Sequence, residues 1–127
     1  MILNAKKKLY SQLIADTALV TAVGNVKNIV FAMPNNFNAL PVLAYSETSQ
    51  TPYFWADNAQ FGAKVTFDFD IFTAWGVDPQ AIAEKLDTVL TANLWALEMS
   101  MDFLEPDLKI MHKSLKYTRT FRPSEVI

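Results

Sequence analysis

The sequence predicts an α+β fold, in which a mostly antiparallel sheet of four to five strands carries two main helices packed on one face. Two stretches have apolar residues at helical spacing, and several others alternate apolar and polar residues as strands do. The chain has 127 residues, of which 51% are hydrophobic. This suffices for one core but not for two, so we expect residues 1–127 to form a single domain.

The first helix is predicted near the N-terminus. An apolar stripe with spacings of three and four residues is formed by Ile2, Ala5, Leu9 and Leu13, with Tyr10 and Ile14 on its adjoining edge. Asp16 can then cap a second, short helical turn through its carboxylate. Gly24 can end that turn, because glycine adopts the left-handed backbone conformation at low cost.

Two strands are predicted next. Residues 25–31 are rich in β-branched and aromatic side chains, and residues 40–46 resume this pattern with Pro41 near the start, where a strand tolerates proline. The intervening residues 32–39 contain a proline and three asparagines and are expected to form a loop. Residues 47–62 are predicted to be a long polar and aromatic loop, and loops of this length are often functional.

The central strand and the second main helix have the clearest patterns. In residues 65–71, apolar residues alternate with threonine and aspartate, which is typical of a strand with one buried and one solvated face. Asp78 and Pro79 then provide an N-cap and a proline at the first helical position. The helix is expected to present an apolar stripe and to end near Asn93.

Two further strands complete the predicted sheet. Residues 95–103 alternate large apolar with small or charged residues, so their large side chains are expected to contribute to the core. A turn at residues 105–107 leads to a last strand at residues 111–121. The apolar face of that strand is marked by Met111, Leu115, Tyr117 and Phe121.

Composition argues against several functional classes. The chain has 3 glycines, 1 histidine and no cysteine, which leaves few parts for phosphate loops or acid–base catalysis and excludes disulfides and thiol chemistry. A net charge of -2 does not favour nucleic-acid binding through bulk charge. The longest uncharged run, residues 28–46, is broken by prolines, and the N-terminus does not resemble a secretory signal. We expect a protein without catalytic residues, cofactor, metal or membrane contact.

Charge is distributed unevenly along the chain. Residues 47–107 carry 11 acidic residues against Lys64 and Lys85, whereas both flanks are net basic. The lysines at residues 6–8 are expected to lie on a solvated helix face. If folding keeps the opposite charges apart, one surface of a subunit would attract a different surface of the next, which suits head-to-tail association.

Two pairs of carboxylates could bind a metal ion if their strands were neighbours. Asp68 and Asp70 share the polar face of one predicted strand, and Glu98 and Asp102 share that of another. Nothing in the spacing of these carboxylates favours a metal site. We therefore interpret them as residues of an ordinary solvated sheet face. His112 is expected to be a half-exposed strand residue, because a single histidine rarely builds a catalytic or metal site.

Five residues are candidates for contact with a partner protein. Tyr53, Phe54 and Trp55 are consecutive aromatics that cannot all point into one core, so at least one is expected at an interface. Arg119 and Arg122 belong to a basic C-terminal strand that could touch an acidic neighbour or nucleic-acid backbone. Basic residues that guard an edge strand against aggregation explain that strand equally well.

Four segments and their order carry a resemblance to a known family. They are the Asp-Thr-Ala-Leu-Val stretch at residues 16–20, the Leu-Pro-Val-Leu-Ala-Tyr-Ser strand at residues 40–46, the Asp-Ile-Phe-Thr-Ala strand end at residues 70–74 and the helix at residues 81–90. The chain resembles the tail terminator (tail completion, or tail-to-head joining) proteins of long-tailed bacteriophages over nearly its whole length. It departs from them at residues 25–29, where Asn-Val-Lys-Asn-Ile stands in place of an Arg-Ile-Tyr-like strand start.

The resemblance implies a structural protein of the virion. Members of this family form a ring, commonly a hexamer, at the head-proximal end of the tail tube, where the ring stops tube growth and joins the tail to the head. The implied partners are other copies of the chain, the tail tube protein and the head connector or completion protein. Phage DNA would pass through the ring without specific recognition, and assembly would take place in the host cytoplasm.

Other functions remain open at this level. Another phage neck component would share the composition and the lack of catalytic groups. A small ligand-binding domain is a second alternative, since 9 phenylalanines and 5 methionines could line an apolar cavity. An enzyme would require a metal-dependent activity that is lost when Asp68 or Asp70 is changed.

Overall fold

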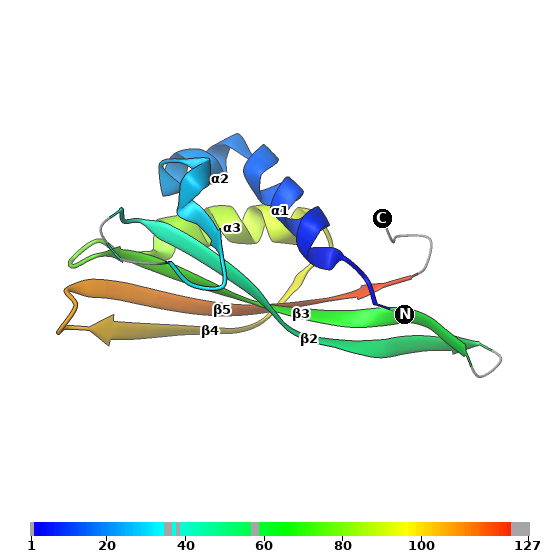
Figure 1. Ribbon diagram of the computed structural model, residues 1–127. Coiled ribbons are helices and arrows are strands. Elements are labelled where there is room, and N and C mark those ends of the chain that lie inside the picture. Colours follow the sequence, from blue (N-terminus) through cyan, green and yellow to red (C-terminus); the bar gives the residue numbers. More distant parts are fainter. Residues whose placement is uncertain (1, 35–36, 38, 57–58, 123–127) are drawn as a thin grey trace.

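The protein folds as a sheet with its helices on one face (Figure 1). This computed structural model describes residues 2–34, 37, 39–56 and 59–122, and of residues 54–56 and 59–61 the backbone only. Within this part of the chain five strands lie in the order β1-β2-β3-β5-β4, so the predicted α+β class is confirmed. The elements are α1 (Ala5–Ala15), α2 (Thr17–Val23), the 3-10 turn η1 (Val26–Asn28), β1 (Ile29–Phe31), β2 (Val42–Ala56), β3 (Ala59–Ala74), α3 (Gln80–Ala92), β4 (Ala96–Glu105) and β5 (Ile110–Phe121).

One aspartate links the two N-terminal helices. The backbone N–H of Asp16 donates to the carbonyl of Leu13 and ends α1, while the Asp16 carboxylate accepts the Leu19 N–H at 2.8 Å and begins α2. Gly24 ends α2 with φ of 102°, the left-handed region that favours glycine. The predicted roles of Asp16 and Gly24 are both confirmed.

The first predicted strand, residues 25–31, is shorter than expected and runs parallel to its neighbour. Only Ile29 to Phe31 form β1, and they pair in parallel with residues 43–45 of β2. A parallel pair requires a crossover, here residues 32–41, and Asn28 holds it in place. The Asn28 amide donates to the carbonyls of Val23, Ala39 and Pro41, the last at 2.8 Å.

The predicted loop at residues 47–62 is wrong, because strands β2 and β3 continue through it. They pair antiparallel from Val42 opposite Phe72 to Ala56 opposite Ala59 and form the long two-stranded arm in Figure 1. The segment is rich in threonine and aromatic residues, which favour extended backbone. It lacks the alternating pattern of a half-buried strand because no helix is seen to cover the far end of the arm (Figure 1).

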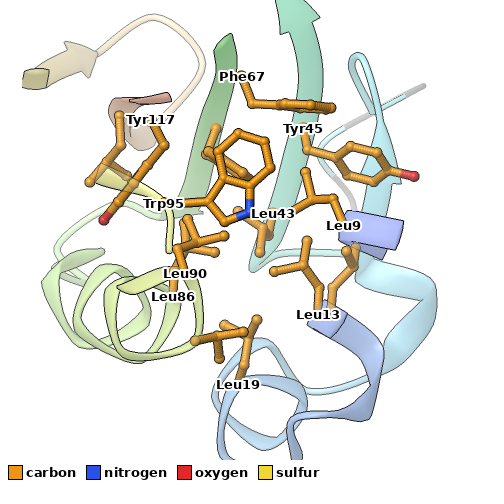
Figure 2. Packing of buried hydrophobic residues seen from close by; sticks show 14 of the residues in the cluster. Leu9, Leu13, Leu19, Leu43, Tyr45, Phe67, Leu86, Leu90, Trp95 and Tyr117 are labelled. Atoms are coloured by element: carbon orange, nitrogen blue, oxygen red, sulfur yellow. The ribbon is translucent and has the colours of Figure 1, made fainter. Parts of the chain in front are cut away.

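The core lies between the helices and the sheet. The apolar stripe predicted for the second main helix packs its leucines, with those of α1 and α2, against the aromatic side chains of β3 and β5 (Figure 2). Trp95, just before β4, meets Phe67 edge-on at 5.4 Å between ring centroids. The helix starts one residue later than predicted, because Pro79 is the N-cap and not the first helical residue; the Gln80 N–H still donates to the Asp78 carboxylate at 2.9 Å.

Strand β4 does not contribute to the core as expected. The pairing with β5 shifts register between Leu97 and Met99, so that Leu97 lies opposite the buried Tyr117 but Met99 lies opposite Lys116. This bulge turns every second side chain after it to the sheet face without helices. Met99, Met101 and Phe103 are therefore 39–47% exposed, and the expectation that they fill the core is wrong.

Candidate assembly interface

The structure places the five predicted contact residues in different environments. Tyr53 lies on β2 with 44% of its surface exposed, and Arg122 is exposed just after β5. The side chains of Phe54 and Trp55 lie outside the described part of the chain. Arg119 is only 8% exposed and lies on the helix-covered face, with its guanidinium carbon 4.2 Å from the ring centroid of Phe121. Contact of the five residues with a partner protein stays a prediction. Arg119 has little exposed surface with which to make such a contact.

The two carboxylate pairs do not meet, because β5 lies between β3 and β4. Asp70 is 2.7 Å from Nε2 of His112 on the face without helices. Asp102 accepts from Lys113 Nζ at 3.1 Å on the opposite face. Among the described residues, no group of three or more acidic or histidine side chains is placed to hold a metal ion.

Two ionisable groups near the centre of the sheet have shifted pKa values for structural reasons. Burial raises the pKa of the Asp68 carboxyl, with Lys116 acting in the opposite direction and Asp70 in the same one. Burial also raises the pKa of Tyr117, and its hydrogen bond to Asp87, 2.6 Å long, adds to that rise. The Tyr117 phenol therefore stays protonated and ties β5 to α3.

A row of aromatic rings crosses the face of the sheet that carries no helix. The ring centroids of Phe37 and Phe72 are 5.1 Å apart, those of Phe72 and His112 4.4 Å, and those of His112 and Phe103 5.1 Å. Residues of the crossover, including Phe37 and Leu40, cover the β1–β2 half of this face. The half of this sheet face next to β4 is not covered in this way, and Met99 and Met101 are exposed on it.

Strand β4 is an apolar edge strand. It pairs only with β5 among the described residues, and every residue from Ala96 to Leu104 is exposed. Edge strands are usually protected by lysine, proline or short length. β4 has 10 residues and neither lysine nor proline, but it carries a bulge and three carboxylates, so it is a partly protected site for association. Its exposed apolar residues are Leu97, Met99, Met101, Phe103 and Leu104.

The opposite side of the sheet also has a free edge. β1 pairs with β2 only as far as Tyr45, so residues 47–56 of β2 have β3 as their one strand partner in the described structure. Thr48, Thr51 and Tyr53 on this stretch are exposed. The sequence does not reveal either edge, because strand order is set by pairing between distant segments.

The charges that are separated along the sequence are only partly separated in space, because the basic strand β5 lies between the acidic strands β3 and β4 and Lys113 Nζ donates to Asp102 at 3.1 Å. α1, η1 and β1 lie on the β2 side of the sheet and carry four lysines and no acidic residue. Lys6 marks this side, with its Nζ 5.5 Å from the ring centroid of the edge residue Phe31. On the other side, α3 and β4 carry five carboxylates and one lysine. The α1 side is therefore basic, whereas the carboxylates of the α3–β4 side lie next to the basic residues of β5.

A groove lies on the acidic side, between α3 and the adjoining strands β4 and β5. Its volume is about 530 Å³, and it is open to solvent. Glu84 and Asp87 line it from the helix, and Leu97, Ser100 and Lys113 line it from the strands. The groove therefore combines apolar walls with carboxylates and one lysine at the sheet edge.

The fold matches a component of a virion particle. No protein-family model and no curated protein matches the chain. Among solved structures, the chain is similar to one in a structure described as "Virion of native gene transfer agent (GTA) particle", with a TM-score of 0.63 and 16% sequence identity. The likeness covers 90% of this chain and 91% of the other, which shows a shared fold over nearly the full length of both. None of the helices in the described part of the chain has the length and apolar character needed to cross a membrane.

Proposed function

We propose that this protein is a structural component of a virion, and that its role there is that of a tail terminator. Copies of the chain assemble as a ring, a hexamer, on the head-proximal end of a tail tube. The ring stops the tube from growing and joins it to the head connector. The observation that carries this proposal is the full-length fold likeness to a chain of a virion particle.

The surface of the molecule supports an assembly role. The basic α1 side differs from the α3–β4 side, where carboxylates lie next to the basic residues of β5, so successive copies can meet through unlike surfaces; such contacts close into a ring when the rotation between copies allows it. The carboxylates and the histidine serve internal hydrogen bonds and ion pairs rather than a shared reaction centre. The protein acts by binding other proteins, without catalysis or a cofactor.

The proposed partners follow from the position of the ring. One face of the ring meets the last layer of the tail tube protein, and the other meets the head connector or completion protein. DNA passes through the lumen without specific recognition. The net charge of -2 also provides no general attraction between the protein and the DNA phosphates. The protein is located at the neck of the virion tail and assembles in the host cytoplasm.

Removing the protein from the particle that contains it tests this role. If the protein ends tube growth, particles assembled without it should have tubes of uncontrolled length and no attached heads. Adding the purified protein should restore tails of uniform length. Tails of normal length that fail only to bind heads would instead identify another neck component, and the terminator proposal would be wrong.

A second test uses the purified protein alone. Light scattering after size exclusion should show a ring-sized assembly, or a monomer that forms rings when it is concentrated, and negative-stain images should show the ring. A monomer that retains a small molecule after purification would favour a ligand-binding domain instead.

A further inference from the structure

The side chain of Gln50 joins β2 to the segment that precedes α1. Its amide makes two hydrogen bonds with the backbone of one residue: Gln50 Oε1 accepts the Leu3 N–H at 2.8 Å, and Gln50 Nε2 donates to the Leu3 carbonyl at 3.1 Å. Figure 1 shows this segment, in dark blue, running from α1 to the strands of the arm. A glutamine amide has both acceptor and donor atoms, so it can satisfy both backbone groups of a residue at once.

The segment that meets Gln50 is itself fixed to the core. Leu3 is 5% exposed and belongs to the cluster of buried residues between the helices and the sheet. The next residue, Asn4, caps α1, since its side-chain oxygen accepts the Lys7 N–H. Residues 2–4 therefore connect Gln50 to the helix layer through a buried leucine and a helix cap.

Gln50 lies where the arm leaves the supported part of the sheet. A bulge between Glu47 and Ser49 comes just before it, and bulges bend the strand that contains them. On one side, β1 pairs with β2 only as far as Tyr45. On the other, residues 59–62 of β3 lie beyond the pairing with β5, which begins at Ala63. The backbone is thus least supported around the position that the Gln50 amide holds.

We infer that residues 2–4 act as a strap that holds the outer arm, residues 51–56 and 59–62, in one direction relative to the helices. This inference goes beyond the proposed function and does not depend on it. Gln50 lies opposite Val65, which is buried under the helices, so the strap holds β2 from the helix side. The Thr48 hydroxyl adds a bond across the bulge by donating to the Thr66 carbonyl at 3.3 Å. An arm held in this way loses less conformational entropy when it meets a partner.

The alternative is that the Gln50 amide serves only the backbone of Leu3. Buried backbone groups need hydrogen-bond partners, and Leu3 is buried. In that case loss of the amide would loosen the start of α1 and leave the arm where it is. The two interpretations differ in which part of the molecule moves, so the test has to report the position of the arm.

Pulsed EPR distances between two spin labels measure that position. The natural chain has no cysteine, so Ala59→Cys in the outer arm and Thr21→Cys on the exposed side of α2 take one label each. A second pair, Thr21→Cys with Lys85→Cys, joins two helices and reports the body of the protein. Gln50→Ala removes both hydrogen bonds to the strap, and Gln80→Ala removes the same kind of side chain from an exposed position on α3 as the matched control. Dilution with unlabelled wild-type chain keeps distances between copies out of the measurement.

In Gln50→Ala the ratio of displaced to held arm conformations, seen between residues 21 and 59, should rise about tenfold, because two hydrogen bonds are lost. The distance between the two helices should stay unchanged, as should both distances in Gln80→Ala. Gln50→Asn, whose amide is one methylene shorter and cannot reach both groups of Leu3, should displace the arm as well and serves if the alanine variant folds poorly. An unchanged arm distance in a folded Gln50 variant would overturn the inference. Equal broadening of the arm distance and the helix distance would show general loosening and would overturn it too.

Discussion

The hydrogen bond from Tyr117 to Asp87 allows a quantitative test of how α3 is attached to the sheet. Tyr117 is fully buried in the core, and its hydroxyl donates to the Asp87 carboxylate at 2.6 Å. Tyr117→Phe removes the hydroxyl and keeps the ring, so it opens no large cavity. Hydrogen bonds to charged groups contribute about 1.5–3 kcal/mol. Because Asp87 is exposed and can bind water in the variant, we expect a loss near the lower limit, about 1–2 kcal/mol.

Urea unfolding at pH 7 of the wild type, Tyr117→Phe, Asp87→Asn and the double variant measures this loss. If the hydrogen bond accounts for it, the two single changes should not add in the double variant. Additive effects, or a loss below about 0.5 kcal/mol in Tyr117→Phe, would show that the bond does not secure α3.

The same bond predicts a specific pH dependence. The pKa of Tyr117 is raised in the folded protein relative to the ordinary value of 10.0, so the unfolded chain loses the phenolic proton first as pH rises. The stabilisation is therefore complete below about pH 10 and is lost as pH increases toward the folded pKa. The difference in unfolding free energy between the wild type and Tyr117→Phe should narrow above pH 10. A difference that stays constant to higher pH would contradict the shift.

Three further changes test the fold and the edge. Phe67→Ala should destabilise the protein by about 3–5 kcal/mol in denaturant unfolding, since Phe67 is fully buried and contacts Trp95; a loss below about 1 kcal/mol would contradict this packing. Asn28→Ala should cost about 1–3 kcal/mol because it leaves the Pro41 carbonyl without its side-chain donor, and an unchanged urea midpoint would refute that role. Met101→Lys should leave the thermal midpoint unchanged but prevent assembly measured by light scattering, because a lysine on an edge strand opposes pairing. Val77→Lys, at an exposed position outside the strands, is the matched control and should still assemble.

Elements whose signals are local could be predicted from the sequence. The helix that starts after Asp78 and Pro79 carries its own start signal and its own apolar stripe, and Gly24 ends α2 by its backbone preference alone. The strand at residues 65–71 lies at the centre of the sheet, where one face is buried throughout, so its alternation is complete. Caps, apolar stripes and strand alternation can be read from a short stretch of sequence, because they depend on the rest of the chain only through the burial of one face.

The missed features depend on pairing between distant segments. In the arm, the described β2 side chains of Thr48, Thr51 and Tyr53 are exposed, and an alternating sequence pattern indicates only strands that are buried on one face. In β4, one bulge near Glu98 reverses the faces of all later residues, although their sequence alternation continues unchanged.

The candidate site was predictable only in part. The separation of charge along the chain is only partly retained: the α1 side is basic, but the basic C-terminal strand β5 pairs with the acidic strand β4. The free edges were not predictable, because they follow from strand order. Arg119 belongs to the odd-numbered residues of β5 that face the helices, which a count of basic residues could not distinguish from an exposed position.

The uneven pairing of β3 has a consequence for the internal motions of the sheet. From Ala63 to Ala74 this strand lies between two partners, whereas residues 59–62 pair with β2 alone within the described structure. A two-stranded ribbon without further support is only marginally stable in water. Amide hydrogen exchange should therefore be graded along a single strand, slow near Phe69 and faster beyond Ala63, with the free energy of local opening falling as the second partner ends.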